Sequence, residues 1–278
     1  LINEEWISDK TRFAYDGLLT QRLDSGYIRE NNKLVEVSNE KLVEIVSKKL
    51  NSSSRIAALL GNNVDCETIF AFKLFLEAFN CNSYDCRQDN SFFIPNDRSS
   101  YTFNSKISGI DDADLFLFIG CDLKKEAPIL NARIRKRYLS SEKNLKIGYI
   151  GLGANYNYNV TNLGESPAII EDILSGKNKF LSHLKSSKKP MFILGQGALC
   201  RNDSEDIYIA SKKLYENANF EKEWNGFNVL QTYSGRTGAL DINFVKSHNN
   251  LKNSKILDRA NNKEFDLLYL FSADEINL

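Results

Sequence analysis

The stretch ADLFLFIG, which spans Ala113 to Gly120, decides the fold of this chain. It is a short apolar run that ends at a glycine, and four other segments repeat this theme. They are RIAALLG ending at Gly61, LKIGYIGLG ending at Gly153, PMFILGQG ending at Gly197 and FDLLYLFSAD ending at Asp274. Strands with apolar residues on both faces are typical of parallel sheets that are buried on both sides. The five segments therefore predict buried parallel strands.

Helical patterns lie between these segments. From Cys66 to Phe79 apolar residues cover most of the helical circumference, so this helix is expected to be largely buried. From Glu126 to Tyr138 the spacing places Leu130, Ile134 and Tyr138 on one helical face. Strands that alternate with helices predict an α/β fold with doubly wound, largely parallel sheets.

Helices are also expected over Ser38–Leu50, with Ser38 as the N-cap, over Gly164–Leu174 and over Asp203–Tyr215. An irregular connection is expected from Arg87 to Asn104, where polar residues and a proline interrupt both patterns. We expect an N-terminal segment with the first helix over residues 1–50, and an α/β region of one or two subdomains over residues 51–278.

Composition excludes several classes of protein. Lys+Arg and Asp+Glu number 36 each, so there is no net positive charge to hold nucleic acid. The longest apolar runs fall well short of the roughly 20 residues of a membrane-spanning helix, which argues against direct membrane insertion. Abundant Asn, Lys and Ile suggest an AT-rich genome, as in an organelle or an intracellular bacterium, and the start at Leu1 suggests a piece of a longer polypeptide.

The residues offer little metal or catalytic chemistry. The 5 cysteines are scattered without a CxxC pair, which argues against both a disulfide framework and an iron-sulfur cluster. His183 and His248 lie far apart, so a packing or solvated role suits each of them. We expect no catalytic, cofactor-binding or metal-binding residue in this chain.

Two glycine motifs are candidates for ligand loops. Gly195 and Gly197 follow a strand, where a dinucleotide-binding loop would lie, but Cys200 stands at the third glycine position and a tight turn fits as well. The stretch Ser234–Gly238 resembles neither a nucleophile elbow nor a phosphate loop, and we interpret it as a flexible loop.

Two charged segments suggest interfaces. Near the N-terminus aromatic side chains stand among charged ones, which suits either an anchor at an interface or a local aromatic cluster. In NARIR an amide lies beside two arginines that can make bidentate contacts within or between subunits, although a basic helix face is often only solvated. The interface candidates are Trp6, Arg12, Tyr15, Asn131, Arg133 and Arg135.

Several motifs together resemble one family. NEEWISDKTRFAYDG followed by QRLDSGYIR resembles the segment just after the iron-sulfur domains in the large iron-sulfur (75 kDa) subunit of respiratory complex I, NADH:quinone oxidoreductase. EAPILNARIRKRYL, LGESPAIIEDI, KKPMFILGQGALCRND and LLYLFSAD extend the resemblance over essentially the whole chain. The corresponding part of that family is similar to molybdopterin oxidoreductases, which implies their α/β fold.

The resemblance implies a structural and assembly role in the peripheral arm of complex I, which supports electron transfer from NADH to quinone. It implies iron-sulfur clusters in the preceding N-terminal portion or in partner subunits, and none here. Other peripheral-arm subunits would be the partners. The location would be the matrix side of the mitochondrial inner membrane, or the cytoplasmic side of a bacterial inner membrane.

The alternative function is that of a molybdopterin-dependent oxidoreductase domain. In such enzymes a Cys, selenocysteine or Ser holds the molybdenum, in the region that reads NCNSYDCRQDNSFF in this chain. Cys86 lies near that place, but the glycine-rich sequence expected around the pterin is missing. The resemblance therefore implies that the cofactor has been lost.

Overall fold

The computed structural model describes residues 4–20, 22–141, 144–153, 155–246 and 256–273, so His248 and Asp274 lie outside the described residues. The chain divides into two compact units, and each unit is built from separated stretches. Unit 1 comprises Leu1–Trp6 and Asp89–Thr237, and unit 2 comprises Ile7–Gln88 and Gly238–Leu278. The expected boundary at residue 50 stays a prediction.

Unit 1 is organised around a parallel sheet of five strands. The strand order is β7 (Thr161–Gly164), β6 (Lys146–Ile150), β5 (Leu115–Ile119), β8 (Pro190–Leu194) and β9 (Phe227–Val229). Every neighbouring pair is parallel, which confirms the parallel arrangement predicted for the segments that end at Gly120 and Gly197. The central strand β5 comes first in sequence. The next two strands, β6 and β7, lie on one side of it, and the last two, β8 and β9, lie on the other.

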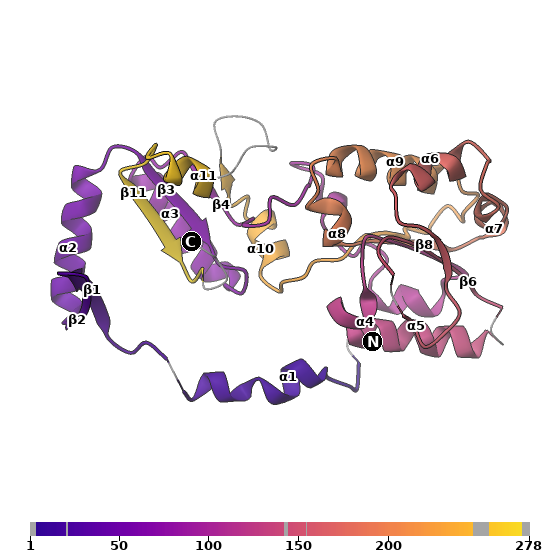
Figure 1. Ribbon diagram of the computed structural model, residues 1–278, viewed down its shortest axis with the longest axis horizontal. Helices are drawn as coiled ribbons and strands as arrows, with labels where there is room; N and C mark the ends of the chain where they lie inside the picture. The colour runs from indigo at the N-terminus through magenta and orange to yellow at the C-terminus, as the bar shows by residue number, and fades with distance from the viewer. Residues whose placement is uncertain (1–3, 21, 142–143, 154, 247–255, 274–278) are drawn as a thin grey trace. The chain divides into compact units, whose positions relative to one another are not determined.

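Helices cover both faces of this sheet, as Figure 1 shows. On one face α5 (Pro128–Ser140) buries Ile134 and Tyr138 against Phe116 and Phe118 of β5. On the other face the alternate residues of β5 pack on α6 (Ala168–Leu174), α7 (Phe180–Ser186) and α9 (Ser204–Glu216). The doubly wound α/β prediction is therefore confirmed.

Two helix boundaries in unit 1 differ from the prediction. The helix expected from Glu126 to Tyr138 begins only at Pro128, as α5, because proline suits the first turn of a helix and not its interior. Glu126 instead ends a separate short helix, α4 (Leu123–Glu126). The helix expected from Gly164 begins only at Ala168. Gly164 ends β7 instead and has a φ of 134°, which favours glycine.

Unit 2 contains a smaller sheet with the order β10 (Val245–Lys246), β4 (Tyr84–Asp85), β3 (Ile56–Leu60) and β11 (Leu267–Phe271). β3 is parallel to both of its neighbours, as predicted for the strand that ends at Gly61, whereas β10 runs antiparallel to β4. α3 (Cys66–Ala78) packs its Phe72 on the rings of Tyr269 and Phe271. Ile256 of α11 (Ile256–Asn261) packs with Ala57 and Leu59 of β3.

The expectation that α3 is largely buried is wrong for part of its surface. Ile69, Phe72 and Leu76 are buried, but Phe70 and Leu74 are 54% and 51% exposed. A helix that lies on one short sheet can bury only the stripe that faces the sheet, and the apolar surface of α3 is wider than that stripe.

The N-terminal part of unit 2 forms a separate substructure. β1 (Gly26–Glu30) and β2 (Lys33–Val37) form a hairpin whose two-residue turn, Asn31 and Asn32, has positive φ at both positions. The side chain of Ser38 accepts a hydrogen bond from the Lys41 N–H and caps α2 (Asn39–Ser52), as predicted. No helix among the described residues combines the length and hydropathy that crossing a membrane requires.

Candidate functional site

A cavity of about 430 Å³ lies at the carboxyl ends of β5, β6 and β8 in unit 1. Its walls are the segments that leave these strands, including Gly120 after β5, Gly151 after β6 and Gly197 after β8. Ligands of open α/β sheets bind at this edge, where the order of the strands reverses. This is also the size of a small-molecule pocket. The fold therefore identifies this cavity as the candidate functional site.

Three glycines beside the cavity let the segments after β5 and β8 touch. Gly120 has a φ of 61°, and a Cβ there would stand 2.4 Å from the Ala198 backbone nitrogen. A Cβ on Gly197 would stand 2.6 Å from the Gly120 carbonyl oxygen, and one on Gly195 would stand 2.3 Å from the Cys121 Cβ. Packing therefore accounts for the two glycines of the candidate dinucleotide loop, which favours the tight-turn interpretation.

Carboxylates slightly outnumber basic groups in the lining of the cavity. Among the described residues, Asp122, Glu126 and Glu165 line it together with two basic residues, Lys125 and Arg201. Lys125 lies 3.3 Å from the Asp122 carboxylate. The Arg201 guanidinium makes two hydrogen bonds to Asp203, at 2.7 and 2.8 Å. Both basic groups thus already have acidic partners, so the cavity offers a poor environment for a phosphate group.

The buried groups of the cavity are held in their neutral forms. Burial, with the nearby Glu126 and Asp122, raises the pKa of the Cys121 thiol well above its usual range. Burial, followed by the effect of nearby Cys121 and several carboxylates, raises the pKa of Tyr149 to about 12. A thiol that stays protonated is a poor nucleophile, so Cys121 is not an activated nucleophile in this cavity.

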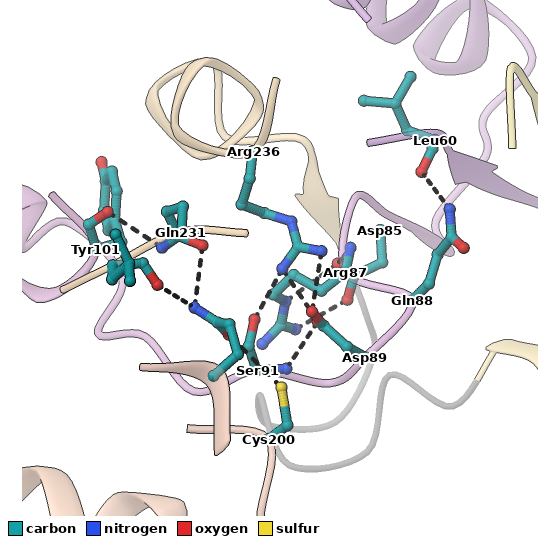
Figure 2. A network of polar contacts seen from close by, with 12 residues as sticks. Leu60, Asp85, Arg87, Gln88, Asp89, Ser91, Tyr101, Cys200, Gln231 and Arg236 are labelled. Carbon is teal, nitrogen blue, oxygen red and sulfur yellow. Dashed lines mark hydrogen bonds and ion pairs between the residues drawn. The ribbon is translucent and has the colours of Figure 1, made fainter. Parts of the chain in front are cut away.

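A second polar cluster in unit 1 surrounds Arg236, at the start of α10 (Arg236–Asp241), and is drawn in Figure 2. The Arg236 guanidinium donates to the two Asp89 carboxylate oxygens at 3.0 and 3.2 Å and to the Ser91 hydroxyl at 2.8 Å. The Arg236 side chain is 1% exposed and that of Asp89 is 28% exposed. The interpretation of Ser234–Gly238 as a flexible loop is therefore wrong at Arg236, which is a buried anchor for the stretch after Gln88.

The Cys200 thiol lies beside this cluster. Burial, then the Asp89 charge, raises the pKa of Cys200 to about 12, although Arg236 acts in the opposite direction. The sequence carries no clear signal for this arrangement. In the sequence, Arg236 differs from the other arginines only in that it stands between two small residues, Gly235 and Thr237.

Unit 2 has its own buried ion pair, in the stretch NCNSYDCRQDNSFF where the sequence resemblance implied a molybdenum ligand. Arg87 donates to the Asp85 carboxylate through Nε at 3.1 Å and through Nη2 at 2.8 Å, and both side chains are at most 1% exposed. Cys86, between them in sequence, is also 1% exposed. Within the described residues no group of three His, Cys, Asp or Glu side chains could hold a metal ion.

The interface candidates near the N-terminus are open to solvent. Trp6 is 69% exposed and Tyr15 is 58% exposed, and Arg12 is exposed as well. Arg12 lies in α1 (Asp9–Phe13), which begins where the Ser8 side chain accepts a hydrogen bond from the Thr11 N–H. Their role at an interface stays a prediction.

The candidates on α5 are partly engaged within unit 1. The Arg133 guanidinium forms ion pairs with Asp111 and with Glu4, and its side chain is 12% exposed. The Asn131 side-chain oxygen accepts a hydrogen bond from the Tyr158 hydroxyl at 2.6 Å, whereas Arg135 is exposed. Arg133 thus ties the segment that carries Trp6 to α5.

This fold, with a ligand-type cavity at the carboxyl ends of its parallel strands, is that of a doubly wound α/β ligand-binding domain. Residues 22–278 match the model of the molybdopterin oxidoreductase family, and the chain belongs to that family. Residues 1–16 match a second family model, the NADH-ubiquinone oxidoreductase NDSU1/NuoG-like 4Fe-4S domain. The first residues therefore resemble part of a 4Fe-4S domain, although residues 1–16 contain no cysteine.

Curated relatives agree with the predicted resemblance. The chain is 37% identical to an NADH-quinone oxidoreductase subunit of Rickettsia bellii over 99% of its own length and 39% of the relative. It is 35% identical to the NADH-ubiquinone oxidoreductase 75 kDa subunit of Reclinomonas americana, over 100% of the chain and 42% of the relative. A mitochondrial NADH dehydrogenase iron-sulfur protein 1 of Solanum tuberosum is also 35% identical, over 100% of the chain and 36% of the relative. The chain therefore spans about two fifths of the relatives' length.

A solved structure supports the fold alone. The structure of the formyltransferase/hydrolase complex FhcABCD from Methylorubrum extorquens contains a chain that superposes with a TM-score of 0.66. The match covers 91% of this chain and 78% of that one, at 13% sequence identity.

The residues of the cavity do not suit the cofactor that gives the family its name. A pterin cofactor brings anionic phosphate, which basic side chains or free backbone N–H groups would have to receive. In this cavity carboxylates outnumber basic groups, and both basic groups are paired with carboxylates. Cys86 is buried, and in sequence it stands between Asp85 and Arg87, which form a buried ion pair. The fold of the family is present, whereas the charged side chains of this cavity do not suit an anionic cofactor.

Proposed function

We propose that this chain is a structural and assembly portion of the large iron-sulfur subunit in the peripheral arm of an NADH:quinone oxidoreductase. The names of its relatives support this, because they are subunits of that complex. The observation that carries the proposal is the lining of the cavity. A pocket whose carboxylates outnumber its basic groups, and whose basic groups are paired with carboxylates, fits a scaffold that has kept its fold without the cofactor.

On this proposal the chain holds no iron, molybdenum or pterin and has no catalytic residue. The iron-sulfur clusters would lie in other parts of the subunit or in partner subunits. Its partners would be other subunits of the peripheral arm, at the matrix side of the mitochondrial inner membrane or the cytoplasmic side of a bacterial one. The similarity of residues 1–16 to a 4Fe-4S domain supports a direct connection to the cluster-bearing part.

The N-terminal segment would make that connection through Trp6, Arg12 and Tyr15. An aromatic ring that is 69% exposed, as in Trp6, suits an interface better than free solvent. Arg133 would act indirectly, because its ion pair with Glu4 holds the residues next to Trp6 on α5. Asn131 and Arg135 would contribute from the same helix.

The experiment is the substitution Trp6→Ala in the complete complex. Loss of an anchoring interface aromatic costs more than roughly 1 kcal/mol of binding free energy, so the amount of assembled complex should fall. Native gel electrophoresis and NADH:quinone activity would measure the loss. Ile209→Ala on α9, which removes an apolar side chain that is 53% exposed, is the control. Equal amounts of complex in both variants would refute the anchoring role.

The cavity itself favours one alternative, a molybdopterin-dependent oxidoreductase domain, since a space of about 430 Å³ remains at the sheet edge where open α/β folds bind ligands. Molybdenum and pterin measurements on the purified protein separate the two functions. Stoichiometric molybdenum would favour the alternative.

A further inference from the structure

The two basic side chains around the cavity of unit 1 are already paired with carboxylates. The Lys125 ammonium lies 3.3 Å from the Asp122 carboxylate, and the Arg201 guanidinium donates to Asp203 at 2.7 and 2.8 Å. Within each pair the positive charge is balanced by a negative one. Neither basic group therefore brings a net positive charge to a ligand in the cavity.

The other two carboxylates of the lining have no such counterion. Glu126 ends α4 and Glu165 lies between β7 and α6, so they reach the cavity from different segments. Within the part of the chain that the structure describes, neither carboxylate forms an ion pair. One Glu126 oxygen accepts a hydrogen bond from the Asp122 N–H at 2.6 Å, which orients this side chain. The cavity therefore carries an excess of negative charge.

The Tyr149 hydroxyl adds an acceptor to the same cavity. The side chain lines the cavity and is 4% exposed. The hydroxyl donates its hydrogen to the Leu152 carbonyl oxygen, so its own oxygen can only accept a further hydrogen bond. Burial, followed by the effect of Cys121 and of the three lining carboxylates, raises the pKa of Tyr149 to about 12. The three carboxylates thus act together on one buried group of the cavity.

The rest of the lining is largely apolar. It includes Ile119, Ile150, Leu152, Pro167 and Ile207. Apolar walls with a few polar groups, around a space of about 430 Å³, are typical of sites for small organic molecules. A bare metal ion fits less well, because among the described residues no group of three His, Cys, Asp or Glu side chains could hold one. The lining therefore favours an organic ligand that supplies hydrogen-bond donors and positive charge.

We propose that this cavity binds a small organic cation. Its ammonium or guanidinium group donates to the Glu126 and Glu165 carboxylates and to the Tyr149 hydroxyl oxygen, and its apolar body packs on the aliphatic walls. This preference is the opposite of that expected for a ligand with phosphate groups. The proposal goes beyond the scaffold role and does not depend on it, because residues of unit 1 alone form the cavity.

Three probes with the same body and different head groups test this preference: cyclohexylmethylammonium, cyclohexylmethanol and cyclohexanecarboxylate. Chemical-shift titrations of the purified full chain at neutral pH measure their affinities. The ammonium should bind roughly 10-fold more tightly than the alcohol, because hydrogen bonds to charged groups are the stronger ones, and the carboxylate should bind most weakly. The amides of Gly120 and Gly151, which line the cavity, should shift. Equal affinities for the ammonium and the alcohol, tighter binding of the carboxylate, or no binding of the ammonium would overturn the proposal.

A pair of charge-removing variants locates the effect. Glu165→Gln should weaken binding of the ammonium probe roughly 5-fold and leave binding of the alcohol unchanged. Glu171→Gln is the matched control, because it removes an exposed carboxylate of α6 that does not line the cavity. Equal ammonium affinities of the two variants would overturn the proposal. The assembly of the chain with complex I subunits is measured separately, so a failure here can be told apart from a failure of the proposed function.

Discussion

Replacement of Arg236 tests whether the buried cluster around Asp89 stabilises unit 1. The Arg236 side chain is 1% exposed and donates hydrogen bonds to both Asp89 carboxylate oxygens and to Ser91. Arg236→Met keeps much of the volume but leaves the Asp89 carboxylate without its opposite charge. Removal of one partner of a fully buried pair costs about 3–5 kcal/mol. Because the Asp89 side chain is 28% exposed, water can solvate it, and we expect about 2–4 kcal/mol.

Thermal unfolding of the purified chain measures this effect. For a chain of this size each kcal/mol shifts Tm by about 2–4 °C, so a loss of about 3 kcal/mol corresponds to roughly 6–12 °C. Arg201→Met is the matched control, because Arg201 makes the same kind of pair with Asp203 but both side chains are more than two fifths exposed. That pair should contribute only about 0–1 kcal/mol. Equal Tm shifts in the two variants would refute the reasoning.

The pH dependence gives a second check on the same variant. Burial raises the pKa of Asp89, but the charge and hydrogen bonds of Arg236, with those of Ser91, lower it by more, so the pKa lies below its ordinary range. A carboxylate with a lowered pKa stabilises the folded state above its unfolded pKa, and this contribution is lost as pH falls through the folded pKa. The destabilisation by Arg236→Met should therefore be complete at pH 7 and shrink below about pH 4.

Two further predictions concern the cavity and the thiols. Gly120→Ala should lower the free energy of unfolding by more than about 1 kcal/mol, because Gly120 has a φ of 61° and the new Cβ would meet the Ala198 backbone. Gly153→Ala is the control and should change the free energy of unfolding little, because no atom lies within 4 Å of its Cβ position. Similar melting temperatures for both variants would contradict the packing role of Gly120. Cys66 and Cys200 are both exposed, but the thiol pKa of Cys200 is raised to about 12, so iodoacetamide at about pH 8 should modify Cys66 first. Peptide mass spectrometry that finds Cys200 modified first would contradict this order.

The architecture is predictable from the sequence because the signals for buried parallel strands are local. A run such as LFLFI is apolar on both faces, and such a strand is typical of a sheet whose two faces are both covered by helices. The division into units is harder to predict, because each unit is built from stretches that lie far apart in the sequence. No local composition marks such a boundary.

The site is less predictable than the fold. Arg236 and Asp89 are 147 residues apart in sequence, and neither stands in a motif that indicates its partner. Phe70 and Leu74 have the pattern of core residues, but whether a helix buries one stripe or two depends on what packs around it. The charged residues of the cavity come from segments that follow different strands. The acidic character of the cavity therefore cannot be predicted before it is known that the sheet brings Asp122 and Glu165 to one edge.

The composition of the assembly that is isolated through an affinity tag on this chain tests the proposed scaffold role most directly. Quantitative mass spectrometry of the subunits, with metal and pterin analysis of the same sample, measures it. We predict that complex I peripheral-arm subunits purify with the chain and that molybdenum and pterin are absent. Stoichiometric molybdenum and pterin on the chain, without complex I subunits, would contradict the proposal.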